Sequence, residues 1–156
     1  MILYRLVKSR YSRDIARKGA ELCGGRWNSV GVPMLYTCPS RALAMAEVAV
    51  HLPLGILPKD FVMVTLYVPD EGGMKVLPQI DLPNGWFHYP PIYSTQRIGD
   101  AFIRKSDYLV LQVPSAVVHD DFVALINPHH PLFPQVKMLE QRPFVFDRRL
   151  FQHHLS

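Results

Sequence analysis

The sequence has little charge and almost no cysteine. Charged residues make up 19% of its 156 residues, hydrophobic residues make up 49%, and there are only two cysteines. This balance excludes a long disordered chain and favours a packed core. Cys23 and Cys38 are too few for a disulfide framework and match no metal or redox spacing, which suits a reducing compartment. We therefore expect one globular domain over residues 1–156.

Long apolar runs are also lacking. No window approaches the ~20 consecutive apolar residues of a membrane span. The apolar start MILYRLV is short and contains Arg5, so it does not have the pattern of a signal peptide. The 17 basic residues give a net charge of +4 but are scattered, with no recognition helix, zinc-finger spacing or ribonucleoprotein motif. We therefore expect a cytoplasmic protein with no membrane contact and no direct contact with nucleic acid.

Proline is plentiful, and 14 prolines divide the chain into short elements. Alternating or β-branched runs predict strands at 2–7, 34–37, 61–68 and 108–113, with weaker candidates at 122–125 and 144–146. Helices are expected at 41–52, with Ser40 as N-cap and Pro53 at its end, and at 95–105, where Gly99 marks close packing. Long connections are expected at 69–91, which contains a short strand, and at 128–143. This order predicts an α+β fold with mixed or antiparallel sheets and a few helices.

The first expected helix carries one carboxylate, Glu47, among residues that are apolar on every side, which predicts a buried helix. A buried carboxylate needs a partner or a function, because its desolvation costs several kcal/mol (on the order of 3–5) when it is unpaired. One interpretation is a structural ion pair with His51, Arg5 or Arg26. The other is a catalytic carboxylate in the apolar wall of a cleft.

The segment CGGRWNSVG places a guanidinium, an indole and an amide side by side at Arg26, Trp27 and Asn28. Its glycines fit neither the dinucleotide fingerprint nor the P-loop. Backbone N–H groups at such a turn can still form an anion site, and Arg26 can add a bidentate clamp. Trp27 taken alone is more simply a core residue. Tyr36, in the following short strand, either stacks on a planar ligand or packs.

Two other kinds of site are not favoured. Ser115 follows a strand, but the sequence has no Gly-x-Ser-x-Gly elbow and no ordered base for a serine nucleophile. Histidines occur in adjacent pairs at 129–130 and 153–154, yet neighbouring residues of an extended chain point apart. They have no acid or thiol partners at matching spacing, so no metal is expected.

Taken together and in order, the motifs resemble the RES domain, a family named for its arginine, glutamate and serine. The resemblance covers essentially the whole chain. It rests on an early YR, GGRWNSVGVPMLY, A-x-x-E ending at Glu47, STQRIGDAF, LVLQVPSAVV, ALINPHHP and FVFDRRL.

The resemblance implies the toxin half of a bacterial toxin–antitoxin pair, with a fold similar to that of ADP-ribosyltransferases. The substrate implied is NAD, cleaved between nicotinamide and ribose, with ADP-ribose passing to water, phosphate or a protein. The implied partner is an antitoxin of the Xre type with a helix-turn-helix, which alone contacts DNA. A homodimer is compatible with the apolar composition.

Carried onto this chain, the family residues fall on Arg5, Arg26, Tyr36 and Glu47, with Ser115 as the first choice for the serine and Ser94 as the second. The implied catalytic residues are Glu47, Arg5 and Tyr36. The implied NAD contacts are phosphate binding by Arg5 and Arg26, ring stacking by Tyr36 and Trp27, and polar contacts from Asn28, Ser94 and Ser115. Two other functions remain open, namely a toxin that acts on or binds nucleic acid and a non-catalytic interaction module.

Overall fold

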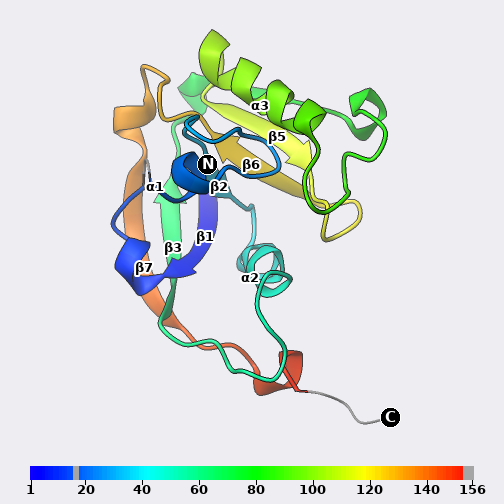
Figure 1. The fold of residues 1–156 in the computed structure, drawn as a ribbon. Coiled ribbons are helices and arrows are strands. Elements are labelled where there is room, and N and C mark those ends of the chain that lie inside the picture. Colours follow the sequence, from blue (N-terminus) through cyan, green and yellow to red (C-terminus); the bar gives the residue numbers. More distant parts are fainter. Residues whose placement is uncertain (16–17, 153–156) are drawn as a thin grey trace.

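The fold contains two β-sheets, as a computed structural model that describes residues 1–15 and 18–152 shows. The first sheet has the strand order β1–β3–β7 and is antiparallel throughout (Figure 1). The second has the order β2–β6–β5–β4, in which only the β4–β5 pair is parallel. The strands are β1 (Ile2–Lys8), β2 (Leu35–Thr37), β3 (Phe61–Tyr67), β4 (Met74–Val76), β5 (Val110–Pro114), β6 (Phe122–Ile126) and β7 (Lys137–Phe144). The expected α+β class with mixed and antiparallel sheets is confirmed.

In the part of the chain that the structure describes, three α-helices accompany the sheets: α1 (Lys18–Cys23), α2 (Arg41–Ala49) and α3 (Tyr93–Lys105). In Figure 1, α3 lies over the second sheet, whereas α2 lies below that sheet, on the side of β1. Short 3-10 turns occur at Ser9–Tyr11, Asp70–Gly72, Gln79–Asp81, Phe133–Gln135 and Arg148–Leu150. Within the described ranges, no helix is long and apolar enough to cross a membrane.

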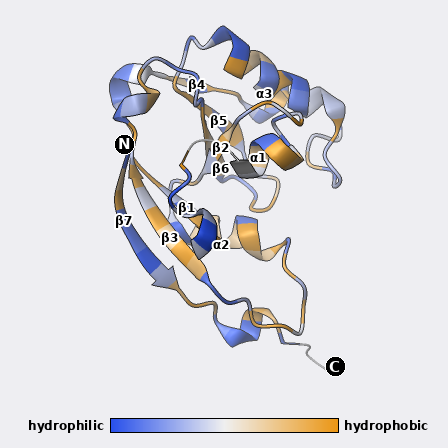
Figure 2. Ribbon diagram, turned by 60° about the vertical axis from the view of Figure 1, so that its left-hand side comes forward, coloured by the Kyte–Doolittle hydropathy of each residue, from blue (hydrophilic) through white to orange (hydrophobic). Residues whose placement is uncertain are grey.

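Strand β3 is the buried centre of the first sheet, and β7 is its exposed edge. Every residue from Phe61 to Leu66 is buried, and Figure 2 shows apolar β3 beside the more hydrophilic β7. We expected a connection at 128–143 and a strand at 144–146, which is wrong, because the strand runs from Lys137 to Phe144. Its charges and Pro143 suit an edge strand, which pairs on one side only.

The start of α2 agrees with the expected cap, but its burial does not agree with the expected buried helix. The Ser40 Oγ accepts a 3.1 Å hydrogen bond from the Leu43 backbone N–H. Regular helix ends at Ala49, and hydrogen bonds from the N–H groups of His51 and Leu52 add a last turn. Only Leu43 and Ala44 are buried, because one side of α2 borders a cleft.

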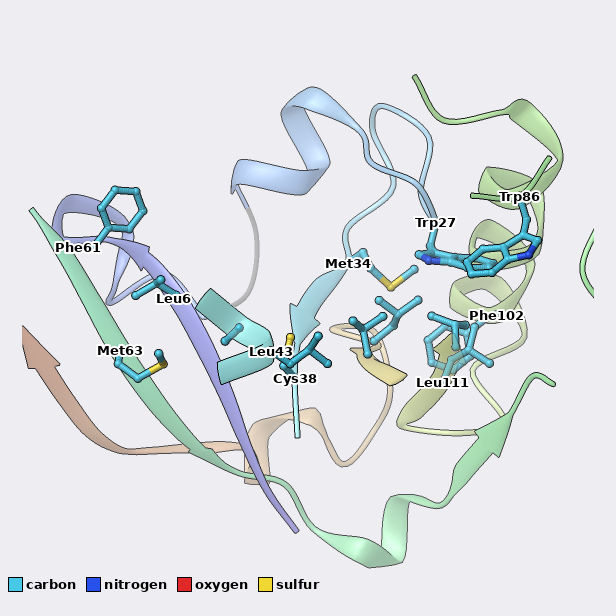
Figure 3. Close-up of a cluster of buried hydrophobic side chains, with 14 of the residues drawn as sticks. Leu6, Trp27, Met34, Cys38, Leu43, Phe61, Met63, Trp86, Phe102 and Leu111 are labelled. Carbon is cyan, nitrogen blue, oxygen red and sulfur yellow. The ribbon is translucent and has the colours of Figure 1, made fainter. Parts of the chain in front are cut away.

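Helix α3 packs backbone against backbone on the glycine-rich segment. A Cβ at Gly99 would overlap the carbonyl oxygen of Trp27, so the expected close packing at this glycine is confirmed. One residue further, the Asp100 carboxylate accepts hydrogen bonds from Ser29 N–H (2.9 Å) and Ser29 Oγ (2.6 Å). Figure 3 shows Trp27 and Trp86 at the same end of the buried cluster, near Phe102 of α3. These contacts fix the segment that carries Arg26.

Candidate active site

A cleft of about 1090 Å³ is bordered by residues from both sheets, from α1, α2 and α3, and from the loops at 24–27, 87–91 and 116–117. Its size lies slightly above the usual range of ligand pockets, which is about 300–1,000 Å³. Among its lining residues are Tyr4, Arg5, Arg26, Tyr36, Cys38, Glu47, His51, Phe87, Tyr89, Gln96 and Val117. Arg5, Arg26, Tyr36 and Glu47, predicted from separate motifs, therefore share one cavity.

The carboxylate of Glu47 is hydrogen-bonded to Ser115. Ser115 Oγ donates to Glu47 Oε1 over 2.7 Å, and accepts hydrogen bonds from the N–H groups of Val117 (3.0 Å) and Val118 (2.9 Å). A hydroxyl has one donor and two acceptor positions, so the two N–H groups direct the Ser115 hydrogen to Glu47. Ser94 instead lies on the exposed first turn of α3, away from the cleft lining.

Glu47 forms no ion pair with any residue that the structure describes, including Arg5, Arg26 and His51. The proposed structural ion pair is therefore not seen among them. Arg26 is nevertheless within electrostatic range of Glu47. Burial lowers the pKa of the Arg26 guanidinium, and the negative charge of Glu47 opposes that lowering.

Arg26 is held by a loop on the far side of the cleft. Its Nη1 donates to the carbonyl oxygens of Trp86 (2.6 Å) and His88 (2.8 Å). Nε and Nη2 of Arg26 donate no hydrogen bond to any residue that the structure describes. Among the described residues, the protein therefore bonds one of the three guanidinium nitrogens, and Arg26 itself lines the cleft.

Arg5 enters the same cleft from β1. Its Nη1 donates a 3.1 Å hydrogen bond to the Asp14 carbonyl oxygen. Burial lowers the pKa of Arg5, and the Asp14 charge opposes that lowering. An arginine keeps its proton under such conditions, so the cleft contains two guanidinium cations.

Tyr36 is fixed by the two residues that follow Arg26. Its hydroxyl donates to Asn28 Oδ1 (2.7 Å) and accepts from the Trp27 backbone N–H (3.0 Å). Burial raises the pKa of Tyr36, so the phenol stays protonated. A Cβ at Gly25 would lie 2.6 Å from the Tyr36 oxygen, which explains the glycine there.

Two residues that are expected to contact NAD have buried side chains. Trp27 is 1% exposed and Asn28 is 0% exposed. The Asn28 Nδ2 donates to the carbonyl oxygens of Ala20 (2.7 Å) and Val32 (2.9 Å), while Oδ1 holds Tyr36. Trp27 is a core residue that also borders the cleft, and Asn28 is a positioning residue that holds Tyr36. Contact of either side chain with NAD stays a prediction.

Several lining residues were not singled out from the sequence. Gln96 donates from Nε2 to the Gly25 carbonyl oxygen (3.0 Å) and so joins α3 to the glycine-rich turn. Phe87 and Tyr89 come from the loop before α3, in the stretch WFHYPPIY. The density of aromatic residues between prolines in that stretch is the signal that points to them.

The structure shows no group of three potential metal ligands within residues 1–15 and 18–152. The histidine pair at 129–130 lies outside the cleft lining, and the pair at 153–154 lies outside the described residues.

The profile of the RES domain matches residues 2–147. The chain belongs to the RES domain family. It is 36% identical over 141 residues to the "Prs ADP-ribosylating toxin" of Sphingobium sp. (strain YBL2), a match over 89% of this chain and 88% of that protein. It is also 36% identical over 155 residues to the "Toxin Res" of Photorhabdus laumondii subsp. laumondii, covering 96% of this chain and 97% of that protein.

Among solved structures, the M. tuberculosis MbcT–MbcA toxin–antitoxin complex contains a similar fold. The TM-score is 0.69, and the match covers 92% of this RES chain and 84% of the other chain. Their sequences are 18% identical, so this likeness concerns the fold alone.

Proposed function

We propose that this RES protein is a toxin that cleaves NAD at the bond between nicotinamide and ribose. The observation that carries the proposal is the hydrogen bond from buried Ser115 to Glu47, a carboxylate that lines a cleft together with two arginines. The relatives named as toxins, one of them ADP-ribosylating, support the same substrate class.

The chemistry requires only one carboxylate. Nicotinamide is already cationic in NAD, so when the C–N bond breaks, its electron pair leaves with nicotinamide and no general acid is needed, whereas an ordinary glycoside requires two carboxyl groups. Positive charge then develops on the ribose as an oxocarbenium ion, which Glu47 stabilises. Because Ser115 occupies Oε1, Oε2 of Glu47 is the oxygen available to the ribose.

The arginines fix the rest of the molecule. Arg5 and Arg26 bind the pyrophosphate, for which a planar guanidinium is well suited. Tyr36 presents its ring to the nicotinamide end, since its hydroxyl is occupied by Trp27 and Asn28. Positioning of the sugar in this way lowers the entropic part of the barrier.

The partner that we propose is an antitoxin of the Xre type, and the fold shared with a toxin of a toxin–antitoxin complex supports it. DNA would be contacted only through this antitoxin. We further propose that the protein acts in the cytoplasm, where NAD is available, that it needs no metal, and that it forms a homodimer.

Nicotinamide release from NAD by purified protein tests the proposal. Glu47→Gln removes the charge that stabilises the oxocarbenium ion, so turnover is expected to fall by about 100-fold or more. Glu71→Gln, at an exposed site in a 3-10 turn, is the matched control and should leave turnover unchanged. Equal turnover by wild type and Glu47→Gln would remove Glu47 from the mechanism, and no release by wild type would contradict NAD cleavage.

The acceptor of ADP-ribose is found by mass spectrometry of the products. Free ADP-ribose indicates hydrolysis, a phosphorylated ADP-ribose formed in phosphate buffer indicates phosphorolysis, and a modified protein in cell extract indicates transfer.

A further inference from the structure

The mouth of the cleft has an aromatic rim, which we define as His51, Phe87 and Tyr89. Phe87 is 54% exposed and Tyr89 is 75% exposed, and all three side chains line the cleft. The rings of Tyr89 and His51 lie with centroids 5.7 Å apart and planes tilted by 48°. The rim therefore joins the end of α2 to the loop before α3.

The loop that carries the two aromatic residues is held in place. Arg26 Nη1 bonds the carbonyl oxygens on both sides of Phe87, those of Trp86 and His88. Trp86 itself is buried in the hydrophobic core (Figure 3). The exposure of Phe87 and Tyr89 is thus imposed by fixed backbone rather than by a free loop.

Exposed aromatic rings with a fixed backbone are suited to stacking on a flat ring. Base–aromatic stacking contributes about a 5- to 150-fold gain in affinity per base. It tolerates any planar base, because it uses the π face of the ring rather than hydrogen bonds at its edge.

The rim also lies at the right place along the cleft. His51 lies in the turn that ends α2, four residues after Glu47, and lines the same cleft. Arg26 links Glu47 to the aromatic rim. Its guanidinium lies within electrostatic range of Glu47, and its Nη1 bonds the loop that carries Phe87 and Tyr89. Because Arg26, to which we assign the pyrophosphate, bonds the loop that carries Phe87 and Tyr89, a base attached beyond the pyrophosphate can reach that loop.

We infer that the rim formed by Phe87, Tyr89 and His51 binds the adenine ring of the dinucleotide. This assignment rests on the proposed function, since the base at the far end of NAD is adenine. The nicotinamide end is already assigned to Tyr36 and Glu47, which leaves Phe87 and Tyr89 for the adenine.

The test combines binding of ADP-ribose, measured by calorimetry, with the KM and kcat for NAD. Tyr89→Ala should raise the Kd for ADP-ribose and the KM for NAD together by about 10-fold. The kcat should stay within about twofold, because a remote contact made equally in ground state and transition state affects KM alone. Phe87→Ala should act in the same direction. Tyr93→Ala, exposed on α3 and outside the cleft lining, is the matched control.

Each outcome separates the adenine site from the proposed reaction. Unchanged Kd and KM in both rim variants, in a wild type that cleaves NAD, would overturn the adenine site and leave the reaction standing. A fall in kcat as large as the fall in kcat/KM would also overturn it, because the loop would then act through Arg26. If wild type binds ADP-ribose and Tyr89→Ala loses it, the site stands even when no nicotinamide is released. Wild type that does not bind ADP-ribose would contradict it.

Discussion

Ser115 Oγ donates its hydrogen to Glu47 Oε1 over 2.7 Å, although the two residues are 68 positions apart in the sequence. Glu47 stands on α2 and Ser115 on the turn that follows β5. The two N–H groups that bond the same hydroxyl leave it a single direction for its proton. Ser115 therefore orients Glu47 and selects which carboxylate oxygen faces the cleft.

Replacement of Ser115 should reduce both turnover and stability, because Glu47 loses its donor and the N–H groups of Val117 and Val118 lose their acceptor. Ser115→Ala removes a hydrogen bond to a charged group, which contributes about 1.5–3 kcal/mol, and we expect nicotinamide release to fall by about 10- to 100-fold. Ser94→Ala on the exposed turn of α3 is the control, with an expected change within about twofold. Steady-state rates with NAD, alongside thermal melting of each variant, provide the measurement. A loss shared equally by the two variants would contradict the role of Ser115.

Packing at Gly99 can be tested by adding one methyl group. Gly99→Ala forces a Cβ against the Trp27 carbonyl oxygen, a backbone atom that cannot rotate away. We expect the free energy of unfolding to fall by about 3 kcal/mol. Gly19→Ala is the matched helical control, because nothing lies within 4 Å of its Cβ, and it should gain about 0.5–1 kcal/mol. Urea unfolding monitored by circular dichroism measures both, and equal stabilities would refute the contact.

The buried thiol of Cys38 should make stability depend on alkaline pH. Burial, with a smaller contribution from Glu47, raises the pKa of Cys38 from 9.0 to about 12. Between those values the unfolded chain loses a proton that the native chain keeps, so the free energy of unfolding falls as pH rises. Burial also raises the pKa of Tyr36, which adds to the fall at higher pH.

The measurement is urea unfolding at several pH values from about 8 to 10.5. Cys38→Ala should show a shallower fall than wild type, whereas Cys23→Ala, at an exposed thiol, should follow wild type. Identical slopes for wild type and Cys38→Ala would show that the native thiol titrates normally.

Elements with strong local signals could be predicted from the sequence. The residues of β1 alternate between two faces, those of β3 are mostly apolar, and α2 begins after a serine N-cap. The predicted positions of these three elements were therefore correct. β7 and α1 were missed for physical reasons. β7 is a charged edge strand with Pro143, and α1 has only six residues and a glycine.

The site divides in the same way. The sequence pattern and family resemblance together placed Arg5, Arg26, Tyr36 and Glu47, which the structure brings into one cleft. The pattern and the resemblance did not distinguish residues that contact a ligand from residues that position other side chains. Asn28 looks like a polar ligand residue in the motif GRWN, but it is buried, and its amide holds Tyr36. Such roles depend on contacts across the fold, which local patterns do not encode.

The position of Ser115, after β5 in the second sheet, determines when its contact with Glu47 can form during synthesis of the chain. β5 is held by β6 on one side and β4 on the other, and β6 in turn holds β2. During synthesis, a chain released from the ribosome only as far as α3 has Arg5, Arg26 and Glu47 but has neither Ser115 nor the strands that position it. The Glu47–Ser115 hydrogen bond can therefore form only after β5 and the turn that follows it have emerged, and chains terminated before residue 115 lack it.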